Sequence, residues 1–252
     1  MCVPLVSAIQ HPLMPEQFPL HFEFLANQTF NDFFAGENQP IIDSLQQCVL
    51  GNGEQKIFIR GKSGQGKSHL LQACCHYAQQ QEKLSFYFDL SRHSRHQPAI
   101  LSGIDDYNVV CLDNVDTIVG DVKWEQALYT LMKSHYEKGH QLIISSRYLP
   151  NYLNVKTSGL KEHLNWGLIL QLKTLVDTNN IDALIFKADA MGFEISPQAG
   201  RFLVIHYPAE LHDLWHLLAE IDRASLAAKR KLTVPFLKQL FNTTSHTKNS
   251  SH

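Results

Sequence analysis

The chain has 252 residues, of which 44% are hydrophobic and 18% charged, and its formal net charge is -2 with neutral histidines. Such values are typical of a soluble globular protein that holds one α/β domain of ordinary size and a smaller appendage. The balance of charge and the lack of a Lys/Arg-rich run argue against strong nucleic-acid binding by this chain alone.

The first 25 residues contain four prolines among apolar side chains, so we expect a flexible segment that forms neither a long helix nor a core. Within this segment, Gln17 precedes three large apolar side chains, in the order Q-F-P-L-H-F from Gln17 to Phe22. That order suits a short peptide that docks extended into an apolar pocket, with alternate side chains as anchors. A disordered leader is the alternative that the pattern leaves open.

A phosphate-loop sequence lies at Gly61 to Ser68, which reads G-K-S-G-Q-G-K-S and fits G-x-x-x-x-G-K-[ST] at every fixed position. A buried strand is predicted before it, over Lys56–Arg60, and a helix after it, over His69–Gln81. Glycines let backbone N–H groups converge on phosphate oxygens, the lysine reaches the terminal phosphates, and the serine holds Mg²⁺. The expected nucleotide-binding residues are Gly61, Gly64, Gln65, Gly66, Lys67, Ser68 and His69.

The remaining apolar runs alternate between strands and helices, which predicts an α/β fold with a parallel sheet and right-handed crossovers. Together with Lys56–Arg60, the predicted strands are Leu84–Leu90, Tyr107–Leu112, Gln141–Ser146 and Leu168–Leu172, five in all. The predicted helices outside the phosphate-loop region are Pro40–Leu50, Trp124–Lys138 and the short turn Leu160–Leu164.

An acidic residue, Asp113, ends the apolar run Tyr107–Leu112. A run that is apolar throughout is typical of a parallel strand covered on both faces, and ligands bind beyond the carboxyl ends of such strands. In a phosphate-loop protein this acid is the Walker B residue, so we expect Asp113 to hold Mg²⁺ together with Ser68.

From about residue 177 the predicted strands stop, and four helices predict a small all-α lid. These helices are Asn180–Met191, Ser196–His206, Ala209–Lys229 and Val234–Phe241. The expected organisation is a flexible segment 1–25, an α/β nucleotide-binding domain 26–176, a helical lid 177–241 and a disordered tail 242–252.

Other motifs limit the function further. The five cysteines form no C-x-x-C pair and the fourteen histidines no H-E-x-x-H spacing, so we expect reduced thiols and no metal besides nucleotide-bound Mg²⁺. No apolar run approaches the roughly eighteen residues of a membrane span. The N-terminus lacks the basic and apolar regions of a secretory signal, so we expect a cytoplasmic protein without membrane contact.

The phosphate loop followed by H-L-L, the upstream Q-T-F-N-D-F of Gln28–Phe33 and the small lid resemble the AAA+ module of the bacterial replication initiator DnaA. The likeness is closer to the Hda family of DnaA-related regulatory inactivators, and it covers about residues 17–241. Four stretches carry it: L-D-N-V at Leu112–Val115, I-D-R-A-S at Ile221–Ser225, A-A-K-R-K-L-T at Ala227–Thr233 and V-P-F at Val234–Phe236. The chain ends where the initiator's DNA-binding domain would follow.

This resemblance gives the N-terminal peptide a function, because the Hda family binds the replicative sliding clamp through a short peptide at this place. Gln17, Phe18, Leu20 and Phe22 fill the matching positions, with His21 where the family often has proline.

Three positions depart from the family pattern. His163 stands at the arginine finger, and an imidazole cannot make the bidentate contact of a guanidinium, although Lys161 can substitute as a point charge. His212 stands at the sensor arginine of the lid, beside the nucleotide. Asn114 replaces the acid that orients the attacking water, and an amide cannot act as a base. These departures predict a nucleotide holder rather than a fast ATPase.

The resemblance therefore implies a regulator of replication initiation that binds ADP or ATP with Mg²⁺ and tethers to the replicative sliding clamp, the β subunit. Its expected action is to promote hydrolysis of DnaA-bound ATP, with DNA contacted only through these partners and a homodimer left open. Two alternatives remain: a nucleotide-binding adaptor that docks without stimulating hydrolysis, and a slow self-sufficient AAA+ ATPase.

Overall fold

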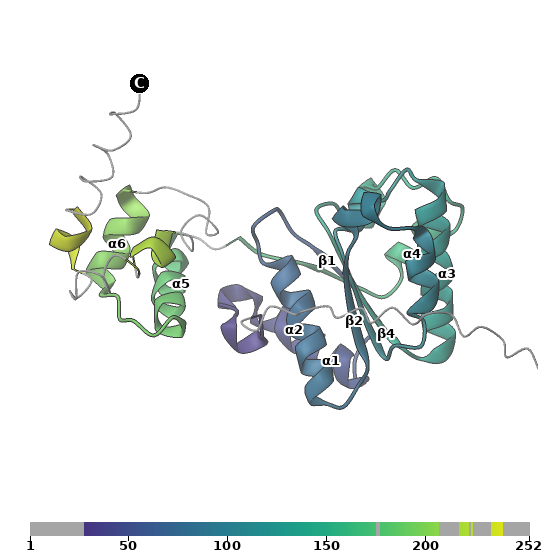
Figure 1. Ribbon diagram of the computed structural model, residues 1–252, viewed down its shortest axis with the longest axis horizontal. Coiled ribbons are helices and arrows are strands. Elements are labelled where there is room, and N and C mark those ends of the chain that lie inside the picture. Colours follow the sequence, from purple (N-terminus) through teal and green to yellow (C-terminus); the bar gives the residue numbers. More distant parts are fainter. Residues whose placement is uncertain (1–27, 175–176, 207–216, 222, 224–232, 239–252) are drawn as a thin grey trace, which may run out of the picture.

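A computed structural model describes residues 28–174, 177–206, 217–221, 223 and 233–238 (Figure 1). The predicted clamp-binding peptide Gln17–Phe22, the sensor position His212 and the tail 242–252 lie outside these residues. The predictions that concern them, like the proposed domain boundaries, remain predictions.

The five predicted strands form one parallel sheet in the order β2-β3-β4-β1-β5, which confirms the expected fold class. Each observed strand lies within two residues of its predicted bounds, because continuous apolar and β-branched runs favour strands buried on both faces. The strands are β1 Lys56–Arg60, β2 Ser85–Asp89, β3 Val109–Asp113, β4 Gln141–Ser146 and β5 Leu168–Gln171.

Helices cover both faces of the sheet (Figure 1). On one side lie α1, Gln39–Leu50, and α2, Lys67–Gln80; on the other lie α3, Val122–Lys138, and the short α4, Leu160–Asn165. The alternation of side chains along β1 separates the two cores, since Phe58 packs with the α3 side while Ile57 and Ile59 pack with the α1–α2 side.

Helix α3 begins two residues before its predicted start because Asp121 caps it. The Asp121 carboxylate accepts hydrogen bonds from the backbone N–H groups of Lys123, at 3.0 Å, and Trp124, at 3.4 Å. Gly139 directly follows the predicted helix Trp124–Lys138 and ends α3 in a left-handed conformation, with φ 70°.

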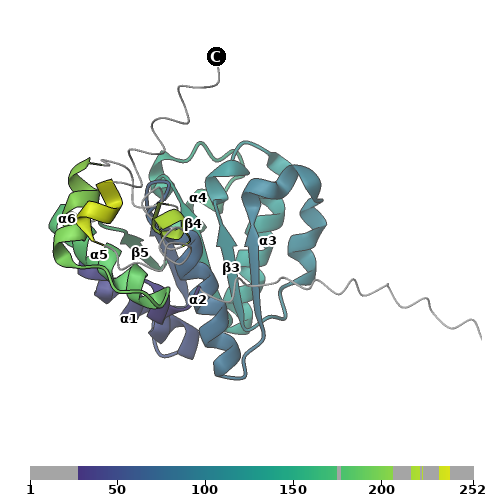
Figure 2. The same ribbon diagram turned by 60° about the vertical axis from the view of Figure 1, so that its left-hand side comes forward.

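The lid follows β5 and has its own small apolar core. Its described helices are α5, Asp177–Ala190, and α6, Pro197–His206, and residues 217–221 and 234–238 are also helical. Leu184, Leu203, Leu218 and Leu237 form the centre of this core. Both views place α5 and α6 beyond the carboxyl end of β5, apart from the sheet (Figure 1, Figure 2). Phe186 of α5 contacts Phe34, just before α1, with the ring centroids 5.7 Å apart.

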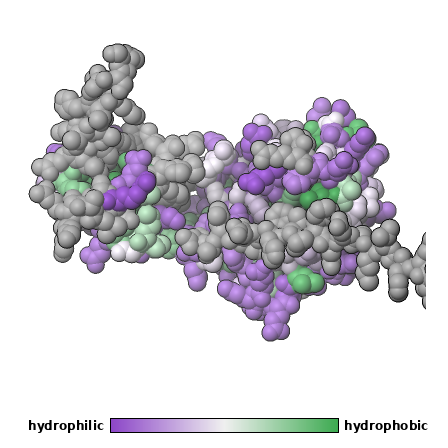
Figure 3. Space-filling model, in the orientation of Figure 1, coloured by the Kyte–Doolittle hydropathy of each residue, from purple (hydrophilic) through white to green (hydrophobic). Residues whose placement is uncertain are grey.

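The described surface is mainly hydrophilic on the face shown in Figure 3, where apolar residues occur only in small separate patches. Among the described helices, none is long and apolar enough to cross a membrane. In the same part of the chain, no group of His, Cys, Asp and Glu side chains is arranged to hold a metal ion by itself.

Candidate nucleotide site

The phosphate loop connects the carboxyl end of β1 to the first turn of α2. Gly61 donates its backbone N–H to the carbonyl of Ser146 at 3.1 Å, which fixes the loop against the end of β4. Gly64 and Gly66 have φ angles of 76° and 86°, in the left-handed region that favours glycine. A Cβ atom on Gly66 would also lie 2.6 Å from Cε2 of Phe33, so this glycine allows Phe33 to pack on the loop.

Two predicted nucleotide-binding residues use their side chains for contacts within the protein. The Gln65 carbonyl oxygen accepts the Lys62 backbone N–H at 2.6 Å, and its amide donates to Thr174 Oγ1 at 2.7 Å. His69 Nε2 lies 2.7 Å from the Thr29 carbonyl, and burial lowers the pKa of this imidazole. Gln65 therefore braces the loop, whereas His69 ties the start of α2 to the segment at Thr29.

Lys67 begins α2 and is only 6% exposed. Its Nζ donates to the Lys62 carbonyl at 2.8 Å, which occupies one of the three N–H donors of the ammonium group. Burial lowers the pKa of Lys67, and the nearby carboxylates of Asp113 and Asp116 oppose this shift. Ser68 follows in the first turn and is partly exposed. Lysine and serine side chains at this helix N-terminus suit phosphate and Mg²⁺.

Asp113 ends β3 and is fully buried. Its Oδ1 accepts a short hydrogen bond from Ser145 Oγ of β4, and its Oδ2 accepts one from the Tyr87 hydroxyl of β2 at 2.9 Å. Ser145 Oγ also accepts the backbone N–H of Asn114, at 3.0 Å. The carboxylate is thus oriented by both neighbouring strands, as a Mg²⁺ ligand requires, and each oxygen keeps a second lone pair. Sequence reasoning missed Ser145 and Tyr87.

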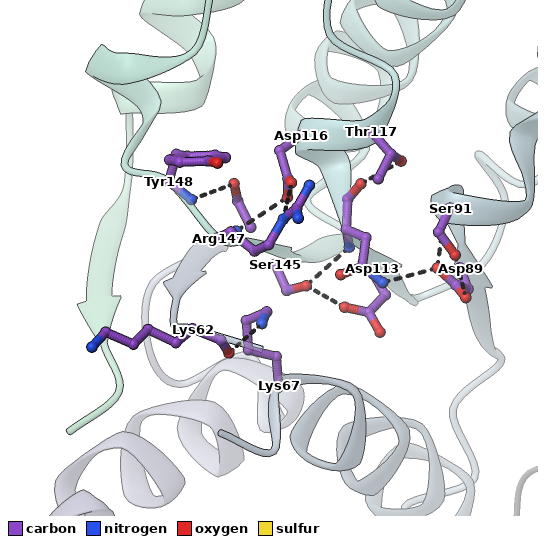
Figure 4. Close-up of polar contacts among 12 residues, drawn as sticks. Lys62, Lys67, Asp89, Ser91, Asp113, Asp116, Thr117, Ser145, Arg147 and Tyr148 are labelled. Atoms are coloured by element: carbon purple, nitrogen blue, oxygen red, sulfur yellow. Dashed lines mark hydrogen bonds and ion pairs between the residues drawn. The ribbon is translucent and has the colours of Figure 1, made fainter. Parts of the chain in front are cut away.

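A second carboxylate lies close to the first, and sequence reasoning missed it as well. Asp116 follows β3 and accepts two hydrogen bonds from Arg147, which follows β4. Figure 4 shows this pair at the same edge of the sheet as Asp113, Ser145 and Lys67. Arg147 directly follows β4, and Asp116 lies three residues after the end of β3, so charged residues just beyond buried strands are the sequence signal that could have found both.

Asn114 lies beside Asp113 in a left-handed conformation, with φ 57°. Its side-chain amide donates to Asp89 Oδ1 at 2.9 Å, so this side chain is tied to the end of β2. An amide held in this way supplies no free base beside Asp113.

His163 lies in α4, which packs with α3 on the opposite side of the sheet from α2. Its Nδ1 lies 3.2 Å from the Gly159 carbonyl, and its ring contacts Tyr129 edge-on with centroids 4.9 Å apart. Lys161 of the same helix is exposed. The structure therefore does not bring His163 and Lys161 into the phosphate site of their own chain.

Lys56 connects α4 to the strand that enters the phosphate loop. Its Nζ donates to the carbonyls of His163, at 3.0 Å, Leu164, at 2.8 Å, and Trp166, the last through a short hydrogen bond. Gly167 has φ 80°, and a Cβ atom there would lie 2.5 Å from the Lys56 carbonyl. The Trp166-Gly167 pair thus lets the turn after α4 cross closely over the start of β1.

Taken together, a parallel sheet with a phosphate loop after its first strand, an acid at the end of β3 and a helical lid defines a P-loop protein of the AAA+ class. A family model described as the bacterial DnaA ATPase domain matches residues 25–171, and one described as the Hda lid domain matches residues 177–241. The chain therefore belongs to the DnaA ATPase-domain family and carries an Hda-type lid.

Solved structures with the same fold agree with this assignment. Domain III of the Thermotoga maritima initiator DnaA matches with a TM-score of 0.71 and 17% identity, over 84% of this chain and 94% of that one. AMPPCP-bound DnaA from Aquifex aeolicus matches with a TM-score of 0.69 and 18% identity, over 79% of this chain and 66% of that one. The Thermotoga maritima RuvB branch-migration motor matches with a TM-score of 0.65 and 14% identity, over 88% and 73% of the two chains.

Proposed function

We propose that this protein is a nucleotide-binding regulator of replication initiation that promotes hydrolysis of the ATP bound to DnaA. The observation that supports this most directly is the succession of a DnaA-type ATPase domain, over residues 25–171, and an Hda-type lid, over residues 177–241. The inactivator role comes from the family resemblance of the lid.

The phosphate loop would bind ADP or ATP through its backbone N–H groups, with Lys67 at the phosphates. Ser68 and Asp113 would hold Mg²⁺, which neutralises charge on the phosphate oxygens when it is bound. The support is geometric: the loop begins a helix N-terminus, Lys67 has spare donors, and Asp113 is held in one orientation by Ser145 and Tyr87. The binding of AMPPCP by DnaA from Aquifex aeolicus, which has the same fold, is consistent with this.

We expect the bound nucleotide to be held rather than hydrolysed quickly. Asn114 stands where a base is needed and its amide is occupied by Asp89. The proposed chemistry therefore takes place on the partner, and α4, with His163 and Lys161, is the surface that would face the nucleotide of DnaA. The segment from Gln17 to Phe22 would tether the chain to the sliding clamp, so that inactivation follows clamp loading on DNA.

The test is a reconstituted assay with clamp-loaded DNA and DnaA that carries radiolabelled ATP, in which conversion to ADP is measured with time. We expect conversion to accelerate with the full-length chain and to fall to the basal rate when residues 1–25 are removed. Lack of acceleration by the full-length chain would refute the inactivator role.

A second candidate, an adaptor that binds clamp and DnaA without stimulating hydrolysis, is favoured by one observation. The imidazole of His163 is packed against Tyr129 and directed to the Gly159 carbonyl, where an arginine finger would need to extend toward the partner. This candidate predicts clamp retention of DnaA in a pull-down without any gain in ADP formation.

A further inference from the structure

Helix α4 is too short to hold its position by itself. It has six residues, Leu160–Asn165, and helices of fewer than about twelve residues are marginal in water without tertiary contacts. It packs beside α3, as Figure 1 shows, and buries only Leu160 and Leu164. Short irregular segments precede and follow it in the chain. The position of α4 therefore depends on the contacts that reach its two ends.

Lys56 of β1 holds the C-terminal end of α4. This residue is 1% exposed, and its Nζ donates to the carbonyls of His163, at 3.0 Å, and Leu164, at 2.8 Å. A short hydrogen bond to the Trp166 carbonyl takes the third N–H of the ammonium group. Carbonyls in the last turn of a helix have no partner within the helix, and a positive charge is favoured beside them. Lys56 therefore caps α4 from a neighbouring strand.

Glu125 of α3 holds the segment that leads into the other end. It is fully buried, and its Oε2 accepts the backbone N–H groups of Lys156, at 3.0 Å, and Thr157, at 2.7 Å. Its Oε1 accepts the N–H of Gly120 at 2.8 Å, which ties the same carboxylate to the loop before α3. The Thr157 carbonyl in turn accepts the N–H of Leu160, the first residue of α4, at 3.3 Å. The start of α4 is therefore connected to α3 through one carboxylate.

Lys56 and Glu125 are both buried without an opposite charge as partner among the described residues. Burial of an unpaired charge is costly, so such groups persist where several oriented hydrogen bonds compensate them. An apolar side chain would fill the same space without that cost, but it could not fix the direction of a carbonyl or an N–H group. The two charges therefore define the placement of α4 against α3 and β1.

We propose that Lys56 and Glu125 are positioning residues for α4, which hold its two ends so that its exposed side chains meet a bound DnaA in one orientation. The proposal rests on the partner-stimulating function set out above. Lys56 is the first residue of β1 and the phosphate loop follows the last, so this contact lies at the opposite end of the strand from the nucleotide site. The two residues should therefore affect the rate of hydrolysis on the partner and leave nucleotide binding by this chain unchanged.

Amide hydrogen exchange of the full chain, followed by mass spectrometry, tests whether the two residues hold α4. Lys56→Met keeps the length of the side chain and removes the ammonium group, and Glu125→Gln removes the charge at constant size. Exchange in residues 156–167 should be at least about tenfold faster in each variant, as expected for the loss of charge-assisted hydrogen bonds. Exchange in β3 should be unchanged, which also shows that the variant is folded. Lys83→Met is the matched control, because Lys83 donates to the Val49 carbonyl at the end of α1, on the other side of the sheet.

The second measurement is the clamp-dependent assay with DnaA and increasing concentrations of each variant. The maximal rate of ADP formation should fall at least about tenfold, because a misplacement of about 1 Å can cost on the order of 100-fold. The concentration that gives half of the maximal rate, and the affinity for ADP measured by calorimetry, should stay unchanged. Lys83→Met should leave all three quantities as they are in the parent chain.

Three results would overturn the proposal: unchanged exchange in residues 156–167, faster exchange there with an unchanged maximal rate, or a lower rate accompanied by weaker ADP binding and faster exchange in β3. The last would indicate a general loss of stability. If Lys56→Met does not fold, Glu125→Gln provides the same two measurements. Failure of the parent chain to accelerate hydrolysis would instead refute the proposed function, and the exchange measurement would still decide whether the two residues hold α4.

Discussion

The hydroxyl of Tyr87 on β2 donates a 2.9 Å hydrogen bond to the carboxylate of Asp113 on β3. The two residues are not direct partners in the sheet, since Asp113 pairs with Asp89 and Tyr87 with Cys111. The long tyrosine side chain therefore reaches diagonally to the acid. Burial and the neighbouring carboxylate raise the pKa of Tyr87, so it remains a protonated donor at every pH of interest.

Tyr87→Phe should lower the free energy of unfolding by about 1 kcal/mol, because Asp113 keeps its Ser145 contact but loses one donor. The substitution should also weaken nucleotide binding relative to the parent chain. This loss should be larger with Mg²⁺ than without it, because Asp113 is then a less firmly oriented Mg²⁺ ligand. Urea unfolding and nucleotide titration with and without Mg²⁺ measure both effects. Tyr77→Phe is the control, since its ring packs on Phe30 and no described residue hydrogen-bonds its hydroxyl. A Mg²⁺-independent loss would contradict the assigned role of Asp113.

Gly66→Ala tests whether Phe33 and the phosphate loop depend on one another. The added Cβ would lie 2.6 Å from the Phe33 ring, on a backbone with φ 86°. The control is Gly139→Ala, where φ is 70° and no neighbouring atom lies within 4 Å of the added Cβ. The control should cost about 1 kcal/mol of stability from backbone strain alone, and Gly66→Ala at least about 1 kcal/mol more. Equal costs in chemical denaturation would show that Phe33 moves aside freely.

The sequence could predict elements that depend on local pattern. The strand predicted over Lys56–Arg60 has its observed bounds, and the phosphate loop and Asp113 follow from spacing alone. Contacts that depend on strand order could not be predicted in this way. Asp116 and Arg147 are 31 residues apart and meet only because β3 and β4 are neighbours in the sheet. The same holds for Lys56, whose ammonium caps the end of α4 across 107 to 110 residues.

His135 should make the protein sensitive to acid. Its side chain, at the end of α3, is 1% exposed. Among the described residues no hydrogen bond of ordinary geometry reaches either ring nitrogen, although the Ile104 carbonyl lies near. Burial lowers its pKa from 6.5 to about 4, and His140 and Lys138 nearby act in the same direction. Between these values the unfolded chain binds the proton and the folded chain does not, so stability falls as the pH falls through this window.

His135→Phe keeps a ring of similar size and removes the titrating group, so it should be more stable than the parent chain at low pH. The difference between the two chains should grow by up to about 3 kcal/mol on going from pH 7 to pH 4, and thermal or urea unfolding at several pH values measures it. A pH-independent difference would show that the pKa of His135 is the same in the folded and the unfolded chain. His76→Phe, on the partly buried side of α2, controls for general effects of losing a histidine.

His163→Arg is the substitution that tests the surface proposed to face DnaA. Arginine at this position, two residues before the end of α4, could extend past Tyr129 and offer a bidentate contact to a partner's phosphate, which an imidazole cannot make. Where arginine fingers act, they contribute on the order of 10³-fold or more to hydrolysis. We therefore expect His163→Arg to raise the rate of ADP formation on DnaA, in the clamp-dependent assay, by at least about tenfold. His163→Lys, a point charge, should raise it less. Lys133→Arg on α3, whose ammonium lies over the Tyr129 ring, should leave it unchanged. Rates that respond to Lys133→Arg but not to His163→Arg would place the partner's nucleotide elsewhere on this face.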